Sequence, residues 1–142
     1  MVADGHTVGN HTATHPDMSK LAGTTALKAE LEPMETLYRE ITGKDLPRYY
    51  RPPQGKFSVN NLESAKELGY KTVFWSLAYV DWNVNSQPSP QSAIEKLNSR
   101  IHNGSVVLLH STSATNADIL ASLIDGWRAM GYEFGNIDEL FE

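Results

Sequence analysis

The stretch SVVLLHSTS, residues 105–113, decides the class of fold because it joins an apolar run directly to a polar cluster. Residues 106–109 are consecutive aliphatic residues, a pattern typical of a strand buried on both faces. Such strands belong to parallel sheets covered by helices, and these sheets bind ligands at the C-terminal ends of their strands. The polar cluster from His110 to Ser113 therefore occupies the expected position of a functional site.

Strand and helix patterns alternate on both sides of this stretch. Strands are expected at residues 6–10, 48–51, 71–77 and 132–134. Helices are expected from Thr24 or Thr25 to 42, then at 58–68, 90–102 and 116–130, with a final helical turn at 137–141. Pro33 is expected to kink or interrupt the first helix. The alternation, without repeats or linkers, predicts one α/β domain over residues 1–142, either an open sheet or a barrel.

Residues 1–5 have the pattern of a helix end, with Gly5 just after the last turn, where a left-handed backbone is favoured. A strand pattern follows directly, so the helix itself is not seen. We therefore expect a further part of the domain upstream of Met1. A short tail before the first strand is the alternative interpretation.

The composition excludes several classes of function. The net charge is −5 and the Lys and Arg residues are scattered, which argues against a nucleic-acid partner. The chain has no Cys, so disulfide scaffolds, thiolate metal sites and Cys nucleophiles are excluded. No apolar run approaches the roughly 20 residues that span a bilayer. No signal peptide opens the chain.

The segment HTATHP, residues 11–16, is the strongest motif. Two imidazoles four residues apart face the same way if the backbone between them is helical, and neutral imidazole suits Zn²⁺ and similar ions. Two exposed loop histidines are the alternative interpretation. A catalytic zinc site normally has three protein ligands and an open position, so His11 and His15 require a third ligand from elsewhere.

Three more polar groups follow predicted strands. Arg51 to Gly55 joins a guanidinium to a Pro-set turn, in which peptide N–H groups can face a developing oxyanion. His110 is placed to act as a general acid or base, and Asp81-Trp82 offers a carboxylate beside an apolar wall. In isolation each also fits an ordinary turn, a satisfied core-edge His or a loop. Aromatic residues near the same rim are candidates for stacking on a sugar ring: Tyr49, Tyr50, Tyr79 and Trp82.

Taken in order, these motifs resemble the polysaccharide deacetylases of carbohydrate esterase family 4, the NodB-homology domain. The matching segments are His11 to Pro16, Arg51 to Gly55, Asp81-Trp82 and Leu108 to His110. The resemblance covers nearly the whole chain. The stretch from Gly5 to Trp82 looks most like the muramic acid de-N-acetylases, which act in the δ-lactam pathway of spore cortex peptidoglycan.

The resemblance implies an incomplete, distorted (β/α) barrel that lacks its first strands. It implies hydrolysis of an N-acetyl group on peptidoglycan or a chitin-like glycan. His11 and His15 would ligate a divalent metal, Zn²⁺ first and Co²⁺ or Mn²⁺ otherwise. The catalytic residues would be His110, which protonates the leaving amine, Arg51, which orients the base, and Asp81. The substrate-binding residues would be Gln54, whose backbone N–H faces the oxyanion, with Pro53, Tyr50, Trp82 and Leu108.

Two departures from the family pattern change these expectations. The family's first motif, T-F-D-D-G, supplies the base Asp and a metal-binding Asp, and it is absent here. The resemblance puts it upstream of Met1, so we expect this chain alone to bind metal weakly and to have little or no activity. Many members also carry an Asp where this chain has Ala78, and that Asp orients the catalytic His. Another group must then orient His110, or its role as an acid is weaker.

Two other functions stay open. One is a non-catalytic glycan-binding remnant. The other is an unrelated metallohydrolase that uses His11, His15 and a carboxylate such as Asp17 or Asp81. The deacetylase interpretation implies a glycan partner and an extracytoplasmic or cell-wall location, with any signal upstream of Met1. An incomplete barrel exposes sheet edges, which favours dimerisation through them.

Overall fold

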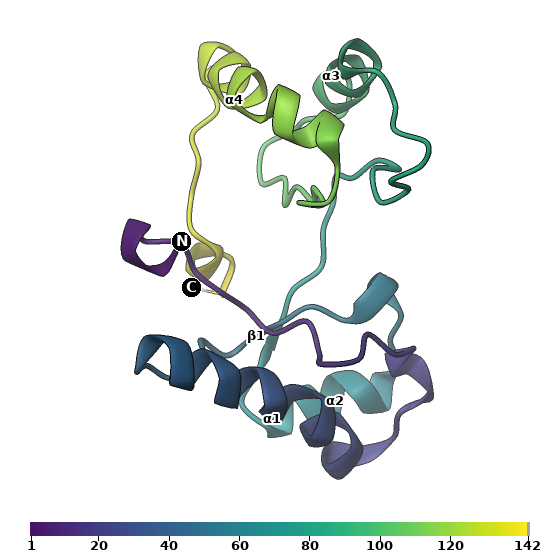
Figure 1. Cartoon of the computed structure of the whole chain (residues 1–142), viewed down its shortest axis with the longest axis vertical. Coiled ribbons are helices and arrows are strands. Elements are labelled where there is room, and N and C mark those ends of the chain that lie inside the picture. The colour runs from purple at the N-terminus through teal and green to yellow at the C-terminus, as the bar shows by residue number, and fades with distance from the viewer. Residues whose placement is uncertain (142) are drawn as a thin grey trace. The chain divides into compact units, whose positions relative to one another are not determined.

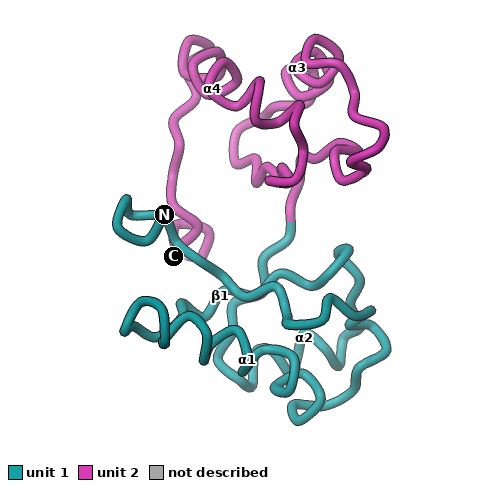
Figure 2. The backbone as a smooth tube through the Cα atoms, in the orientation of Figure 1, with its two compact units in different colours: residues 1–74 teal, residues 75–142 magenta. Residues whose placement is uncertain are grey.

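The computed structural model describes residues 1–141. The chain divides into two compact units, Met1–Phe74 and Trp75–Glu142 (Figure 2). In the first unit, short 3₁₀ turns at Val2–Asp4 and Met18–Lys20 precede helix α1, and a third follows at Pro53–Gly55. The regular elements of this unit are α1 (Gly23–Thr42), β1 (Tyr49–Tyr50), α2 (Val59–Glu67) and β2 (Lys71–Thr72). The second unit contains α3 (Pro90–Asn98), α4 (Ala114–Ala129) and a 3₁₀ turn at Ile137–Phe141 (Figure 1).

The parallel arrangement expected from the alternating pattern is confirmed in the first unit. β1 pairs in parallel with β2, and Asn10 makes a parallel bridge to Tyr50 on the other side of β1. The paired segments are much shorter than predicted, because only two residues of each predicted strand enter the ladder. The predicted strand at 71–77 also crosses the boundary between the units, which lies after Phe74.

Helix ends agree with local sequence signals at several positions. The Ser58 and Ser89 hydroxyls accept hydrogen bonds from the backbone N–H groups of Asn61 and Ser92. Gly43 closes α1 in the left-handed conformation, with φ 69°. The predicted cap at Thr24 or Thr25 is wrong, because α1 begins at Gly23 after Ala22. The interruption at Pro33 does not occur, since the helix continues through it to Thr42.

The core of the first unit lies between α1, α2 and the short sheet. Its buried apolar residues are Met18, Leu27, Leu31, Tyr50, Ala65 and Tyr70. Helix α1 buries Leu27 and Leu31 in its N-terminal half, whereas Leu37 and Ile41 in its C-terminal half are exposed. The contact with α2 therefore anchors the first part of α1.

The second unit has its own core between α3, α4 and the segment around Leu77. Its buried residues are Leu77, Tyr79, Ala93, Leu97, Ile119, Leu123 and Trp127. Helix α4 starts at Ala114, two residues earlier than predicted, because the Ser113 hydroxyl accepts the N–H of Asn116 and so caps it. None of the helices that the structure describes is long and apolar enough to cross a membrane.

Two strand predictions in the second unit are wrong. Residues 106–109 are only half-buried, and their ladder is reduced to one parallel bridge between Leu77 and Val107. Residues 132–134 form no bridge within the described part of the chain. The Tyr132 backbone N–H instead donates to the Trp127 carbonyl and closes the end of α4. Apolar sequence alone does not make a strand, because a strand needs a partner of matching register.

Leu27→Ala is expected to lower the free energy of unfolding by about 2–5 kcal/mol, because it opens a cavity in the core of the first unit. Leu37→Ala is the matched control, since this leucine lies on the same helix but is 47% exposed. We expect the control to cost less than about 1 kcal/mol. Urea unfolding followed by circular dichroism measures both, and equal losses would contradict the assigned core.

Candidate functional site

The two histidines of the strongest motif lie together at the end of the first parallel segment. The His11 and His15 ring centroids are 5.1 Å apart and the rings meet edge to face. The backbone between them is not helical, because Thr12 and His15 have positive φ values of 69° and 56°, and yet the two rings lie together. A left-handed conformation is uncommon for residues other than Gly, so this turn is strained and must be held by its surroundings.

Hydrogen bonds within and around the turn hold this conformation. The Thr12 N–H donates to Asn10 Oδ1 at 2.9 Å, and the His15 N–H donates to Thr12 Oγ1 at 3.1 Å. The Ala13 N–H donates to the Glu30 carbonyl on α1 at 3.0 Å. Successive peptide groups of the turn therefore have partners, which offsets the cost of its unusual dihedral angles.

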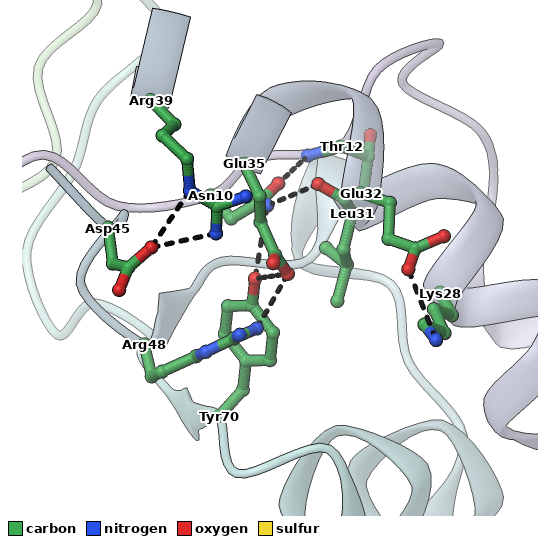
Figure 3. A network of polar contacts seen from close by, with 10 residues as sticks. All are labelled: Asn10, Thr12, Lys28, Leu31, Glu32, Glu35, Arg39, Asp45, Arg48 and Tyr70. Atoms are coloured by element: carbon green, nitrogen blue, oxygen red, sulfur yellow. Dashed lines mark hydrogen bonds and ion pairs between the residues drawn. The ribbon is translucent and has the colours of Figure 1, made fainter. Parts of the chain in front are cut away.

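Asn10 lies at the root of this turn and is almost wholly buried, with 2% of its surface exposed. Its backbone N–H donates to the Tyr49 carbonyl, and its Nδ2 donates to the Leu31 carbonyl at 3.0 Å (Figure 3). Nδ2 also lies 3.4 Å from the Tyr70 hydroxyl. Asn10 thus connects the His turn to β1 and to α1.

A polar chain continues from Asn10 toward the surface of the first unit. The Tyr70 hydroxyl donates to Glu35 Oε1 at 2.5 Å, and Arg48 Nη1 donates to the same oxygen at 2.6 Å (Figure 3). Burial, with the neighbouring Glu35 carboxylate, raises the pKa of Tyr70 to about 12. The phenol therefore stays protonated as a donor to the Glu35 carboxylate.

The turn after β1 carries Arg51 and Gln54. Gln54 has a left-handed backbone with φ 57°, and Pro53 is buried beside it. Desolvation by burial lowers the pKa of the Arg51 guanidinium from its usual value. The Arg51 carbonyl lies 2.6 Å from His11 Nδ1. Because a carbonyl only accepts, Nδ1 carries the proton of the neutral His11 ring, and Nε2 is the nitrogen with a lone pair.

Tyr50 does not fit the substrate-binding role expected for it. Its side chain is fully buried in the core of the first unit, and its hydroxyl donates to Asn61 Oδ1 at 3.3 Å. Burial raises its pKa to about 12. Tyr49 and Tyr79 are also buried, so of the four aromatic residues predicted to stack on a sugar only Trp82 is well exposed, at 57%. The position of an aromatic residue in the sequence near a predicted strand end does not show whether its ring packs in the core or faces solvent.

In the second unit Asp81 and His110 form a close pair. Asp81 Oδ1 lies 2.7 Å from His110 Nδ1, and the His110 backbone N–H donates to Asp81 Oδ2 at 2.7 Å. The carboxylate is buried, with 1% exposed, whereas the imidazole is about one-third exposed at 32%. Asp81 therefore orients His110 in this chain, which answers the question raised by Ala78.

Sequence reasoning missed Asn116, which completes this pair. Its Nδ2 donates to Asp81 Oδ2 at 2.6 Å and to the His110 carbonyl at 3.0 Å. The sequence offered Asn116 only as a residue near a helix start, and no spacing rule connects it to position 81. The Trp82 ring approaches the His110 imidazole, with ring centroids 6.1 Å apart. Leu108, two residues before His110 in the chain, is half-buried.

The expected site residues therefore gather in two groups, one in each unit. The first holds His11, His15, Arg51, Pro53 and Gln54, and the second holds Asp81, Trp82, Leu108 and His110. Among the residues that the structure describes, no three His, Cys, Asp or Glu side chains come together as a metal site. The donors in the first unit fit two ligand positions of a divalent metal, since both are imidazoles with adjacent rings.

Comparisons with known proteins agree with these motifs. A family profile described as polysaccharide deacetylase matches residues 1–73. The peptidoglycan-N-acetylmuramic acid deacetylase PdaA of Bacillus subtilis is 39% identical over 140 residues, which cover 99% of this chain and 53% of that protein. A chitooligosaccharide deacetylase of Bradyrhizobium is 30% identical, covering 99% of this chain and 68% of that protein.

Solved structures give the same result. The structure of Bacillus subtilis PdaA, a family 4 carbohydrate esterase, aligns with a TM-score of 0.91 over 99% of this chain and 60% of that one. A CE4 family pseudoenzyme from Bacillus anthracis is 28% identical and aligns with a TM-score of 0.86, over 99% of this chain and 48% of that one. The chain thus spans about half the length of the first curated relatives that it matches.

Asn10→Ala is expected to destabilise the first unit by about 1–3 kcal/mol, because it leaves the Thr12 N–H without its partner and removes the side-chain bond to the Leu31 carbonyl. The Thr12 amide should then exchange its hydrogen faster in NMR experiments. Asn60→Ala is the control, since exposed Asn60 accepts a single bond from the Gly23 N–H. Unchanged exchange at Thr12 in Asn10→Ala would show that Asn10 does not hold the turn.

Proposed function

Because this chain belongs to the polysaccharide deacetylase family, we propose that it is part of a metal-dependent hydrolase that removes N-acetyl groups from amino sugars of a glycan. Enzymes of this family are hydrolases of amide bonds on carbohydrates. The observation that carries the proposal is the Asp81–His110 pair. A buried carboxylate bound to one imidazole nitrogen is the arrangement that a general acid or base needs to keep its orientation.

His110 would protonate the leaving amine. Asp81 Oδ2 accepts two N–H groups, and Oδ1 faces Nδ1 of the ring, so this carboxylate acts as an acceptor throughout. To protonate the amine the ring must be the imidazolium, in which Asp81 holds Nδ1–H and the Nε2 proton is the one transferred to substrate. The partial exposure of the imidazole supports this role, since a buried ring would not reach a glycan.

His11 and His15 would hold the divalent metal, Zn²⁺ in first place and Co²⁺ or Mn²⁺ otherwise. A metal bound there supplies Lewis acidity, which polarises an acetyl carbonyl and lowers the pKa of a bound water. The Arg51 carbonyl accepts from His11 Nδ1 and so fixes the tautomer in which Nε2 would be the ligating nitrogen. The T-shaped contact with His15 keeps the second ring adjacent.

The remaining residues of the two groups would bind and orient the substrate. The left-handed backbone at Gln54 changes the direction of its peptide group, and its N–H would donate to the developing oxyanion. The guanidinium of Arg51 would orient a carboxylate base. Trp82 and Leu108 in the second unit would form an apolar wall for the acetyl group, and exposed Trp82 is the candidate for a sugar contact. Pro53 in the first unit would contribute a separate apolar contact to the substrate.

We favour the N-acetylmuramic acid of peptidoglycan as the substrate sugar, as in the spore cortex. The 39% identity to a peptidoglycan-N-acetylmuramic acid deacetylase supports it over a chitin-like glycan, for which the relative is 30% identical. A wall polymer as substrate would give the protein an extracytoplasmic, cell-wall-associated location. Within the described residues β2 pairs with β1 only and leaves its other edge without a strand. Self-association through this sheet edge stays a prediction, and light scattering tests it.

A non-catalytic glycan-binding remnant is the second candidate. The alignment of a CE4 family pseudoenzyme over 99% of this chain favours it. Colorimetric measurement of free amines on peptidoglycan and chitooligosaccharide tests the first proposal. We expect little or no amine release by these 142 residues alone. Turnover at the rate of a full-length relative would contradict that expectation, whereas glycan co-sedimentation without metal dependence would favour the remnant.

Titration with Co²⁺, followed by the visible spectrum of the bound ion, tests the metal ligands. We expect weak binding by the unaltered chain, because two imidazoles make an incomplete site. His11→Ala and His15→Ala should each abolish it. His102→Ala is the control, since this exposed imidazole belongs to the second unit and contacts the neighbouring Asn103 carbonyl. Co²⁺ binding that persists in both His11→Ala and His15→Ala would contradict the assignment of these histidines as metal ligands.

A further inference from the structure

Asn116 occupies an unusual position for an amide side chain, near the start of α4 and almost fully buried, with 6% exposed. Each of its polar groups has a partner. Nδ2 lies between Asp81 Oδ2 and the His110 carbonyl, at 2.6 and 3.0 Å. Oδ1 accepts a short hydrogen bond from the Tyr79 hydroxyl, and the backbone N–H donates to Ser113 Oγ.

The partners determine which way the amide points. Asp81 Oδ2 and the His110 carbonyl are both acceptors, so the atom between them must be the NH₂ group, whose two hydrogens match two acceptors. The Tyr79 hydroxyl then donates to the amide oxygen. Rotating the amide by 180° would place one oxygen against two others, which the buried location would penalise strongly.

This orientation of the Asn116 amide fixes the orientation of the Asp81 carboxylate. Its Oδ2 receives two N–H groups, from Asn116 and from the His110 backbone, which approach from different segments of the chain. These two bonds prevent the carboxylate from rotating about its Cβ–Cγ bond. Oδ1 is thereby left facing His110 Nδ1, at 2.7 Å. Without Asn116, the Asp81 carboxylate would keep only its bonds to His110 among the described residues.

A closed ring of hydrogen bonds keeps Asn116 in place. Ser113, which caps α4 at Asn116, donates through its hydroxyl to Gln87 Oε1 at 2.5 Å. Gln87 Nε2 in turn lies 3.2 Å from the Asp81 carbonyl. The ring therefore returns to the residue whose side chain Asn116 holds. Such a network is worth more as a unit than its separate bonds suggest.

We propose that Asn116 is a positioning residue that holds Asp81 and so selects the Nδ1–H tautomer of His110. The importance of this positioning role for catalysis rests on the proposed function, because the tautomer matters only if Nε2 of His110 must exchange a proton with substrate. Asn116 does not touch the reacting atoms in this scheme. It acts on the orientation of Asp81, and Asp81 acts on the imidazole.

The ¹⁵N chemical shifts of His110, measured by NMR in alkaline solution on the 142-residue chain, report this tautomer directly. We expect the Nδ1–H form to dominate in the unaltered chain. In Asn116→Ala the ratio of Nδ1–H to Nε2–H should fall about tenfold, the effect of losing one charge-assisted hydrogen bond. Tyr79→Phe should shift the ratio in the same direction by less, because the amide keeps its two acceptors.

Asn98→Ala is the matched control, an equal truncation in the same unit that removes the bond from Trp127 Nε1 to Asn98 Oδ1. It should lower thermal stability and leave the tautomer ratio unchanged. An unchanged ratio in a folded Asn116→Ala chain would overturn the proposal. If that variant does not fold, an unchanged ratio in Tyr79→Phe would overturn it instead.

The result is separable from the proposed function. A dominant Nδ1–H form that depends on Asn116 supports the positioning role whether or not amines are released from a glycan. Conversely, an active deacetylase that tolerates His110→Ala would refute His110 as the acid, while the tautomer measurement on the unaltered chain would still decide the role of Asn116.

Discussion

A buried polar side chain must find partners inside the protein, and this constraint organises both units. In residues 1–74 the buried group is Asn10, whose amide joins the turn after the first parallel segment to α1. In residues 75–142 it is Asp81, whose carboxylate takes N–H groups from two other segments. Each group lies directly beside a histidine of the candidate site. The hydrogen bonds that satisfy a buried atom thus also set the position of a functional ring.

The two units use this constraint differently. Around Asn10 the chain adopts left-handed dihedral angles at Thr12 and His15, so the turn stores strain that the surrounding bonds offset. Around Asp81 the backbone is ordinary, and the arrangement depends on matching donors to acceptors. The bonds around Asn10 bring two imidazoles together, and the bonds around Asp81 keep one imidazole in a single orientation.

Much of the local structure could be predicted because its causes lie within a few residues. Ser58 and Ser89 cap their helices, and Gly43 ends α1, through contacts with near neighbours in sequence. Strands were less predictable. Each needs a partner far along the chain, and the apolar run at 106–109 forms only a single bridge because just one residue finds such a partner. The alternation of elements predicted parallel pairing, whereas the length of that pairing depended on contacts that no local pattern encodes.

The sequence by itself determined the family, because HTATHP, Arg51 to Gly55, Asp81-Trp82 and His110 are sets of residue types in a fixed order. Only the tertiary structure decided how those residues are arranged. Side-chain burial turned Tyr50 into a core residue, and positive φ angles rather than a helix brought His11 and His15 together. Asn116 became a partner of Asp81 although 35 residues separate them. A hydrogen bond between distant segments forms only if the folded chain brings those segments together. The residue types alone do not specify which distant segments meet.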